Sequence, residues 1–279
     1  MKMVISGGAG FIGSAVVRRI LNATDCHAIV LDNLTYAGNL DALSEVASSP
    51  RYRFVKMDIC DSAGVHALFE QEEPDAILHL AAETHVDRSI NGPENFIQTN
   101  VLGIYRLLDS AFRYWCKLDK TRQSRFRFHH VSTDEVYGSV ADGQKVAENN
   151  PYRPNSPYAA SKAASDHLVR AGYYTFGLPV ITSNSSNNYG PYQFPEKLIP
   201  LMIRRAMKGE LLPVYRARMC ATGFMSTTMP KHCLKYCSAE NRARFIMLAA
   251  TMSVAISTSC RRSPPCLMRL CPAPARTQS

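Results

Sequence analysis

Two acidic residues stand side by side directly after an apolar run, "RFRFHHV", that reads as a buried strand. In "STDEVYG", Asp134 and Glu135 follow Thr133, so one hydroxyl and two carboxylates would lie together where the strand ends. Ligands of parallel α/β sheets bind beyond the carboxyl ends of the strands. Burial and mutual repulsion separate the pKa values of neighbouring acids, so one can donate a proton while the other accepts one. The alternative is an ordinary pair of solvated loop acids.

A second motif, "YAASK", sets Tyr158 and Lys162 four residues apart, on one face of an expected helix. A pair at this spacing is most often solvated surface. Beside a dinucleotide, however, Lys162 can lower the pKa of the Tyr158 phenol and hold a ribose, which makes the phenol a base for alcohol oxidation. His129 and His130 lie nearby without ligand partners at metal spacing. We interpret both as packing or supporting groups.

A glycine-rich turn, "GGAGFIG", puts Gly7, Gly10 and Gly13 between an expected strand and an expected helix. Such a turn lets a pyrophosphate approach the backbone at a helix N-terminus, although an ordinary βα turn is the alternative. Asp32 ends the next strand about 20 residues later, where a carboxylate accepts hydrogen bonds from a ribose and repels a 2′-phosphate. This spacing predicts NAD rather than NADP. Asp58 ends the third strand and is interpreted either as an adenine contact or as a surface cap.

Six β-rich runs alternate with segments of helical period in the first part of the chain. The runs cover residues 2–6, 27–32, 52–58, 76–82, 126–132 and 178–184. This alternation predicts a parallel sheet with helices on both faces. The expected fold class is α/β, a doubly wound Rossmann-type sheet with an incomplete, smaller C-terminal substrate domain. The expected domains are 1–180 (NAD binding and catalysis), 181–215 (start of the substrate domain) and 216–279 (a tail).

Positive charge is concentrated at one end of the chain. The net charge is +9. From Arg216 onward the chain has ten basic residues and one acid, Glu240, so this segment carries the whole net charge and the first 215 residues together carry none. Six of the nine cysteines also fall between Cys220 and Cys271. No apolar run approaches the roughly 20 residues that span a bilayer, and the N-terminus has no signal-peptide pattern. We expect a cytoplasmic protein whose partners include neither a membrane nor nucleic acid.

Together, "GGAGFIG", "STDEVYG" and "YAASK" resemble the extended short-chain dehydrogenase/reductase family, and within it the branch of 4,6-dehydratases that act on dTDP-glucose. The stretches "LDNLTYAGNL", "LAAETHVDRSI", "FIQTNVLGIYRLL" and "SNNYGPYQFPEKLIPL" extend the resemblance from Met1 to about Tyr215. It implies a lyase with NAD as cofactor, a dTDP-sugar as substrate and a homodimer that pairs two long helices from each subunit. The alternatives are a non-catalytic NAD-binding remnant and an epimerase or decarboxylase of the same family. The adjacent acids argue against an epimerase.

The resemblance also implies a role for each of five residues. Tyr158, supported by Lys162, removes the proton of the sugar 4-hydroxyl while NAD takes the C4 hydride, and Thr133 hydrogen-bonds that oxygen. The resulting 4-keto group acidifies C5. Glu135 then acts as base at C5, and Asp134 acts as acid at the departing 6-hydroxyl. Return of the hydride to C6 gives dTDP-4-keto-6-deoxyglucose and restores the cofactor.

Further contacts are carried over by position from the same resemblance. The cofactor set is Gly7, Gly10, Phe11, Ile12, Gly13, Asp32, Asn33, Thr35, Asp58, Ile59, Ala81, Ala82, Thr99, Tyr158, Lys162 and Asn184. The substrate set is His85, Asp87, Arg88, Thr133, Asn187, Lys197, Leu198 and Tyr215. Asn188 and Tyr189 are equally consistent with turn residues, and Arg88 with a surface charge.

The resemblance stops after "LPVY", where the chain continues "RARMCATGFMSTTMPKHC". Cys220, His232, Cys233 and Cys237 fit none of the standard paired zinc spacings, so no metal is predicted. A basic, disordered tail that binds nucleic acid is the other literal interpretation, since "SCRRSPPCLMRLCPAPARTQS" looks unstructured.

A frameshift close to Tyr215 explains the change better. Displaced by one nucleotide, permitted codons for "MCATGFMSTTMPKHC" read Val-Arg-Asp-Trp-Phe-Tyr-Val-Asp-Asp-His-Ala-Lys-Ala-Leu, a motif of the resembled family. The same displacement lets "RFIMLAATMS" read Glu-Ile-Tyr-Asn-Val-Gly-Gly-His-Asn-Glu, another stretch typical of it. Chance does not account for both matches. We therefore expect an out-of-frame, disordered tail from residue 216 and an inactive chain as written.

Overall fold

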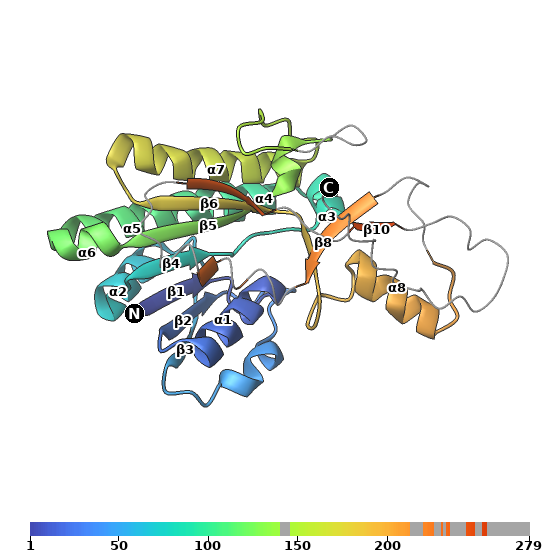
Figure 1. Ribbon diagram of the computed structural model, residues 1–279, viewed down its shortest axis with the longest axis horizontal. Helices are drawn as coiled ribbons and strands as arrows, with labels where there is room; N and C mark the ends of the chain where they lie inside the picture. Colours follow the sequence, from blue (N-terminus) through green and yellow to red (C-terminus); the bar gives the residue numbers. More distant parts are fainter. Residues whose placement is uncertain are drawn as a thin grey trace, which may run out of the picture.

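The computed structural model describes residues 1–139, 146–212, 220–225, 230, 233–234, 244–248 and 253–255. A parallel sheet with the strand order β3-β2-β1-β4-β5-β6-β9 lies at its centre (Figure 1). Its strands are β1 (Lys2–Ser6), β2 (His27–Asp32), β3 (Tyr52–Lys56), β4 (Ala76–His79), β5 (Arg127–Thr133), β6 (Val180–Ser185) and β9 (Arg244–Leu248). The chain winds outward from β1 to β3 and then crosses to β4 on the other side of β1, which is the doubly wound order. The predicted fold class is confirmed, and each of the six predicted runs overlaps one strand of this sheet.

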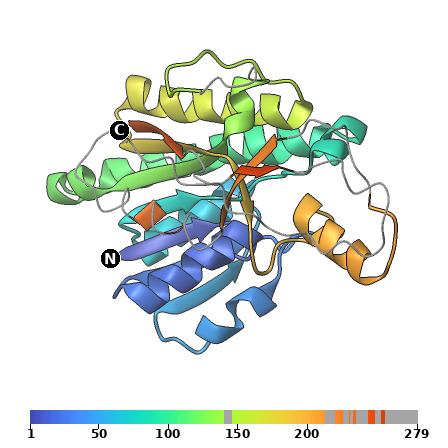
Figure 2. The ribbon, with the colours of Figure 1, turned by 45° about the vertical axis from the view of Figure 1, so that its right-hand side comes forward.

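Helices cover both faces of this sheet, because successive strand residues face opposite ways and both sets are apolar. Met3 and Ile5 of β1 belong to one buried cluster with α1 (Phe11–Ala23) and η1 (Leu40–Val46). Val4 belongs to another cluster with α2 (Ser62–Glu72), α5 (Ile104–Lys117) and α7 (Pro157–Phe176). Figure 2 shows the blue α1 and the yellow α7 on opposite sides of the strands. The helical segments are α1 (Phe11–Ala23), η1 (Leu40–Val46), α2 (Ser62–Glu72), α3 (Val86–Asn91), α4 (Glu94–Phe96), the π-helical η2 (Ile97–Gly103), α5 (Ile104–Lys117), α6 (Lys120–Arg125), η3 (Asp134–Tyr137) and α7 (Pro157–Phe176).

Helix α7, which carries the "YAASK" motif, has strong signals at both ends. Ser156 accepts a hydrogen bond from the Ala159 N–H at 3.0 Å, and Pro157 occupies the first helical position. The helix ends at Gly177, whose φ of 74° is the left-handed conformation that favours glycine. These ends keep the motif on one continuous helix packed against the sheet.

A smaller group of elements lies beside the main sheet (Figure 1). It contains α8 (Leu198–Met207) and a sheet of order β10-β8-β7, built from β7 (Asn187–Tyr189), β8 (Cys220–Met225) and β10 (Ser253–Ala255). Strands β8, β9 and β10 fall in a region where the sequence leads us to expect no ordered element. The domain boundaries and the frameshift stay predictions. Among the described residues, no helix is both long and apolar enough to cross a bilayer.

Two helical glycines give opposite expectations for replacement by alanine. A Cβ at Gly13 of α1 would strike the backbone of Gly7 and Gly8. Gly13→Ala should therefore lower the free energy of unfolding by on the order of 2 kcal/mol. A Cβ at Gly172 of α7 would meet nothing nearer than Leu108 Cδ2 at 3.9 Å, so Gly172→Ala should raise that free energy by about 0.5–1 kcal/mol through helix propensity. Urea denaturation measures both changes, and equal effects would contradict this account of Gly13.

Candidate active site

A cavity of about 360 Å³ lies at the carboxyl ends of the central strands. Its lining comes from the turn after β1, the segment after β4, the end of β5, helix α7 and the segment after β6. The predicted residues that line it are Gly7, Gly10, Phe11, Ile12, Gly13, Ala82, Thr133, Glu135, Tyr158, Lys162, Asn187 and Lys197. The fold therefore brings four of the five predicted catalytic residues to one cavity with the glycine turn.

A smaller cavity of about 120 Å³ adjoins the first one at the glycine turn. Gly7, Gly10, Ala37, Leu80 and Ala82 line both. The predicted cofactor residues that line the smaller cavity are Gly7, Gly10, Asp32, Asn33, Thr35, Asp58, Ile59, Ala81, Ala82 and Thr99. Two neighbouring cavities that share lining residues at one glycine turn fit a dinucleotide whose diphosphate lies at the turn.

The glycine turn itself suits an anion. Gly7 has a left-handed φ of 72°, and α1 begins directly after Gly10 with neither a side-chain cap nor an acidic residue in its first turn. The first N–H groups of α1 and the positive end of its dipole are therefore suited to a phosphate. The Asp32 carboxylate accepts hydrogen bonds from the Ala9 N–H at 2.9 Å and the Leu34 N–H at 2.8 Å, so it supports the turn as well as lining the smaller cavity.

The adjacent acids form the start of η3, the turn that follows β5. The Thr133 hydroxyl accepts a hydrogen bond from the Glu135 N–H at 3.3 Å, which caps this turn. Burial raises the pKa of Asp134 to about 6. Burial raises the pKa of Glu135, the Asp134 charge raises it further by a smaller amount, and the Lys197 charge opposes the increase. Both acids are partly buried, which excludes the solvated-loop alternative. Glu135 lines the larger cavity and Asp134 does not.

Tyr158 and Lys162 are buried rather than solvated, with 7% and 3% of their surfaces exposed. Burial lowers the pKa of Lys162 to about 8, and Asp166 opposes this decrease. Burial and the Glu135 charge raise the pKa of Tyr158 above its ordinary value. The raised pKa reflects the cost of desolvating a phenolate, so the expectation that Lys162 lowers it beside a bound dinucleotide stays a prediction.

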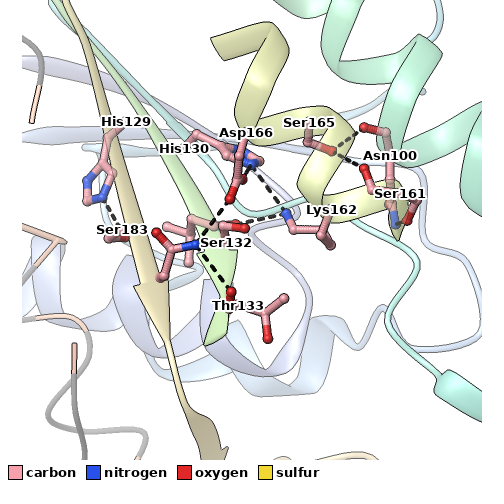
Figure 3. Close-up of polar contacts among 12 residues, drawn as sticks. Asn100, His129, His130, Ser132, Thr133, Ser161, Lys162, Ser165, Asp166 and Ser183 are labelled. Atoms are coloured by element: carbon pink, nitrogen blue, oxygen red, sulfur yellow. Dashed lines mark hydrogen bonds and ion pairs between the residues drawn. The ribbon is translucent and has the colours of Figure 1, made fainter. Parts of the chain in front are cut away.

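Two histidines of β5 support this region from within the sheet. His130 Nε2 lies 3.1 Å from Asp166 Oδ1 and 3.5 Å from Lys162 Nζ, and Figure 3 shows the three side chains pointing toward one another from β5 and α7. His129 Nε2 lies 2.9 Å from Ser183 Oγ. Burial lowers the pKa of His129 to about 3 and that of His130 to about 4, so both rings are neutral near pH 7. Their interpretation as supporting groups is confirmed.

Asn184, predicted to contact the cofactor, lines neither cavity. Its amide donates to the Thr133 carbonyl oxygen at 3.2 Å and to Asp166 Oδ2 at 3.1 Å, so it joins the ends of β5 and β6 to α7. In the described part of the chain, no three His, Cys, Asp or Glu side chains gather as metal ligands. His232, Cys237 and the side chain of Cys220 lie outside that part.

Glu196 organises the side of the larger cavity formed by α3 and the segment before α8. Its carboxylate oxygens lie 2.9 Å from Arg88 Nη2 and 3.5 Å from His85 Nε2. The Arg88 guanidinium also lies 3.9 Å from the centre of the Tyr36 ring, so this residue is paired, but its side chain is 46% exposed and the surface-charge alternative stays open. The predicted substrate residues that do not line the cavity are His85, Asp87, Arg88 and Leu198. The predicted contact of Tyr215 lies outside the described residues.

Two buried polar residues that support the site, Asn100 and Asp166, were missed by sequence reasoning. The Asn100 amide accepts from the Glu83 N–H at 2.9 Å and donates to the Glu83 carbonyl oxygen at 3.0 Å and to Ser161 Oγ at 2.9 Å. It thereby ties the segment after β4 to α7 through η2. The stretch "FIQTNVLGIYRLL" also contains Gln98, Thr99 and Arg106, so polarity alone gave no signal for Asn100.

The chain is similar to proteins of known activity over most of its length. A family model described as GDP-mannose 4,6 dehydratase matches residues 4–219. The dTDP-glucose 4,6-dehydratase of Escherichia coli is 56% identical over 224 residues, which cover 77% of this chain and 62% of that relative. The chain thus spans about three fifths of the length of the first curated relatives it matches.

Solved structures of similar fold include enzymes of two kinds. The dTDP-glucose 4,6-dehydratase of Streptomyces venezuelae, solved with NAD bound, is 40% identical with a TM-score of 0.82 over 91% of this chain and 77% of that chain. The UDP-glucose 4-epimerase of Thermus thermophilus, in complex with NAD, is 26% identical with a TM-score of 0.79 over 91% and 79%. The fold alone therefore does not distinguish dehydration from epimerisation.

Asp134→Asn should stabilise the folded protein in neutral solution. Folding raises the pKa of Asp134 from 3.8 to about 6. A carboxyl group whose pKa rises on folding costs stability above that pKa, and the cost disappears as the pH falls to the unfolded value. Replacement by the neutral amide should raise the free energy of unfolding by about 1–3 kcal/mol above pH 7 and by little at pH 4.

Urea denaturation at pH 4, 6 and 8 measures this gain. Asp25→Asn, which removes an exposed acid at a site remote from the cavity, is the matched control and should show no gain that grows with pH. A gain from Asp134→Asn of the same size at pH 4 and pH 8 would contradict the raised pKa.

Proposed function

This chain belongs to the GDP-mannose 4,6 dehydratase family, and from that membership we propose that its in-frame form converts dTDP-glucose to dTDP-4-keto-6-deoxyglucose. The observation that carries the proposal is a single cavity lined by Thr133, Glu135, Tyr158 and Lys162 beside the glycine turn. The choice of dTDP-glucose is supported by the Escherichia coli relative, which is 56% identical and is a dTDP-glucose 4,6-dehydratase.

NAD is the proposed cofactor. The smaller cavity, with Asp32 at the end of β2, would hold the adenosine ribose, and the N-terminus of α1 would hold the diphosphate. The similar enzymes solved with NAD support this arrangement. When bound, NAD would supply the acceptor of the C4 hydride and return the hydride to C6.

Tyr158 would accept the proton of the sugar 4-hydroxyl, with the Thr133 hydroxyl hydrogen-bonded to the same oxygen. Because burial raises the Tyr158 pKa, forming the phenolate requires nearby positive charge. The Lys162 ammonium, one turn along α7 and in the lining of the same cavity, would supply part of that charge and hold a ribose hydroxyl.

The adjacent acids would eliminate water once C4 is a ketone. Glu135 would take the C5 proton, and Asp134 would give a proton to the 6-hydroxyl, which leaves as water. The pKa of about 6 suits Asp134 to the role of proton donor, and the Lys197 cation favours an ionised Glu135. Glu135 would return its proton to C5 when the hydride reaches C6. An epimerase needs neither acid, so a dehydratase is preferred over an epimerase or decarboxylase of the same family.

The frameshift near Tyr215 is part of this proposal. The family match ends at residue 219, close to the point where charge and cysteine content change. A chain whose reading frame changes there would lose the segment that closes the substrate side of the cavity. Without that segment the sugar would be poorly positioned, and misplacement of a substrate by about 1 Å can cost on the order of 100-fold in rate. The chain as written would then bind NAD without turning over the sugar.

A homodimer and a cytoplasmic location complete the proposal. Helices α5 and α7 and the preceding η2 leave apolar side chains exposed, including Leu102 (41%), Tyr105 (55%), Tyr174 (67%) and Phe176 (56%), which supports pairing of these helices between subunits. Sedimentation as a monomer at micromolar concentration would contradict the dimer.

The cytoplasmic location is supported by the proposed ligands, because both are water-soluble nucleotides. Recovery of the protein with membranes after fractionation would contradict this location.

The written chain and a restored-frame chain, whose codons are shifted by one nucleotide after Tyr215, provide the decisive comparison. They share residues 1–215, so each is the matched control for the other. NAD should bind to both in calorimetric titration, and conversion of dTDP-glucose should occur with the restored-frame chain alone. Equal turnover by both would show that the written tail is native.

Two substitutions in the restored-frame chain separate oxidation from elimination. Glu135→Gln should still oxidise C4, so absorbance of reduced cofactor should accumulate in a single turnover while product formation falls by about 100-fold or more. Tyr158→Phe should fail before any reduced cofactor appears. Glu94→Gln, which removes an exposed acid that lines neither cavity, should behave as the unmodified enzyme. Normal product formation by Glu135→Gln would rule out its role as the C5 base.

A further inference from the structure

Asp166 is a carboxylate buried directly behind Lys162. It is 1% exposed, and the donors that face it include His130 Nε2 at 3.1 Å, the Tyr152 hydroxyl at 2.8 Å and Asn184 Nδ2 at 3.1 Å. These donors come from β5, the loop before α7 and β6. Although burial opposes ionisation, the His130 hydrogen bond and the nearby charges hold the pKa of Asp166 below its ordinary value. Asp166 is therefore a buried negative charge that touches neither cavity.

The neighbours of His130 select one tautomer of its neutral ring. Nε2 faces the Asp166 carboxylate, which only accepts hydrogen bonds, and the Lys162 ammonium, which only donates them. Within the described part of the chain, Nδ1 is buried without a hydrogen-bond partner. If the hydrogen lay on Nδ1, it would have no hydrogen-bond partner, and the Nε2 lone pair would face the negatively charged carboxylate. The hydrogen therefore lies on Nε2 and is donated to Asp166.

This tautomer determines what Lys162 can bind. With its hydrogen on Nε2, His130 offers no lone pair to the ammonium, whose hydrogen bond goes to the Val131 carbonyl oxygen at 3.0 Å. The other N–H groups of Lys162 are left for the larger cavity, which this side chain lines. Figure 3 shows the Lys162 side chain reaching from α7 toward His130 and the backbone of β5.

We propose that Asp166 is a positioning residue for Lys162: it holds His130 as the Nε2–H tautomer and keeps a negative charge behind the ammonium, so that Lys162 stays charged and directed at a ribose. This inference rests on the proposed function, in which Lys162 contacts the cofactor. The charged and titratable groups around Lys162 are His79 on β4, His130 on β5, Tyr158 and Asp166 on α7, and Glu135 of η3 across the cavity. Among them, Asp166 is the carboxylate that lines neither cavity.

NAD titrations of the full written chain between pH 6 and pH 9.5 test this proposal. In the unmodified chain, affinity should fall as the pH rises and Lys162 loses its proton. Asp166→Asn keeps the size of the side chain but removes its charge, so the midpoint of this fall should move down by about one pH unit or more. Tyr152→Phe removes a hydrogen bond to the same carboxylate without removing charge, and its midpoint should stay within about 0.3 pH unit of the unmodified chain.

Each outcome has a distinct meaning. Equal shifts for both variants, or no shift for Asp166→Asn, would overturn the positioning role and leave Asp166 as a structural residue. Failure of the unmodified chain to bind NAD at any pH would instead refute the proposed function. If Asp166→Asn does not fold, ¹⁵N NMR of the unmodified chain decides the matter: His130 should be the neutral Nε2–H tautomer from pH 5.5 to pH 9, and an Nδ1–H tautomer or a protonated ring would overturn the proposal.

Discussion

Backbone pairing among β1, β4, β5 and β6 determines where each chemical group of the site lies. Parallel hydrogen bonding sets Ser6 opposite His79 and His79 opposite His130, so the residues that follow these strands emerge at one edge of the sheet. Thr133 lies opposite Ser185 in the same way. A slip of one residue would turn every side chain of a strand to the other face. The glycine turn, the adjacent acids and the segment after β6 therefore meet only in this register.

Helix α7 adds the remaining groups through its own periodicity. Tyr158, Lys162 and Asp166 are successive members of an i, i+4 series, so they lie along one stripe that faces β5 and β6. The stripe carries a phenol, a cation and an anion in that order with increasing distance from the helix N-terminus. The sheet supplies a partner for each: the Thr133 hydroxyl, the Val131 carbonyl oxygen, and His130 with Asn184.

The strands and the principal chemical motifs could be predicted because their signals are local in sequence. Apolar runs marked every strand of the central sheet as far as β6, and the spacing of Tyr158 and Lys162 set them on one helical face. Asp166 could not be recognised in this way, since its role depends on His130, 36 residues away. The role of Asn100 depends likewise on Ser161, 61 residues away. Burial also depends on the whole fold, so the rise in the Tyr158 pKa caused by desolvation could not be predicted from the spacing of Tyr158 and Lys162.

Asp32 links two parts of the cofactor site that are usually considered separately. Its carboxylate lines the smaller cavity and also accepts the Ala9 N–H, so the group suited to a ribose hydroxyl helps to shape the turn suited to the diphosphate. A change of cofactor preference at this position would therefore loosen the turn unless the new side chain still accepted that N–H. Selectivity and phosphate affinity are thus coupled through one side chain, so a residue that admits a phosphorylated ribose must also accept the Ala9 N–H if the turn is to keep its shape.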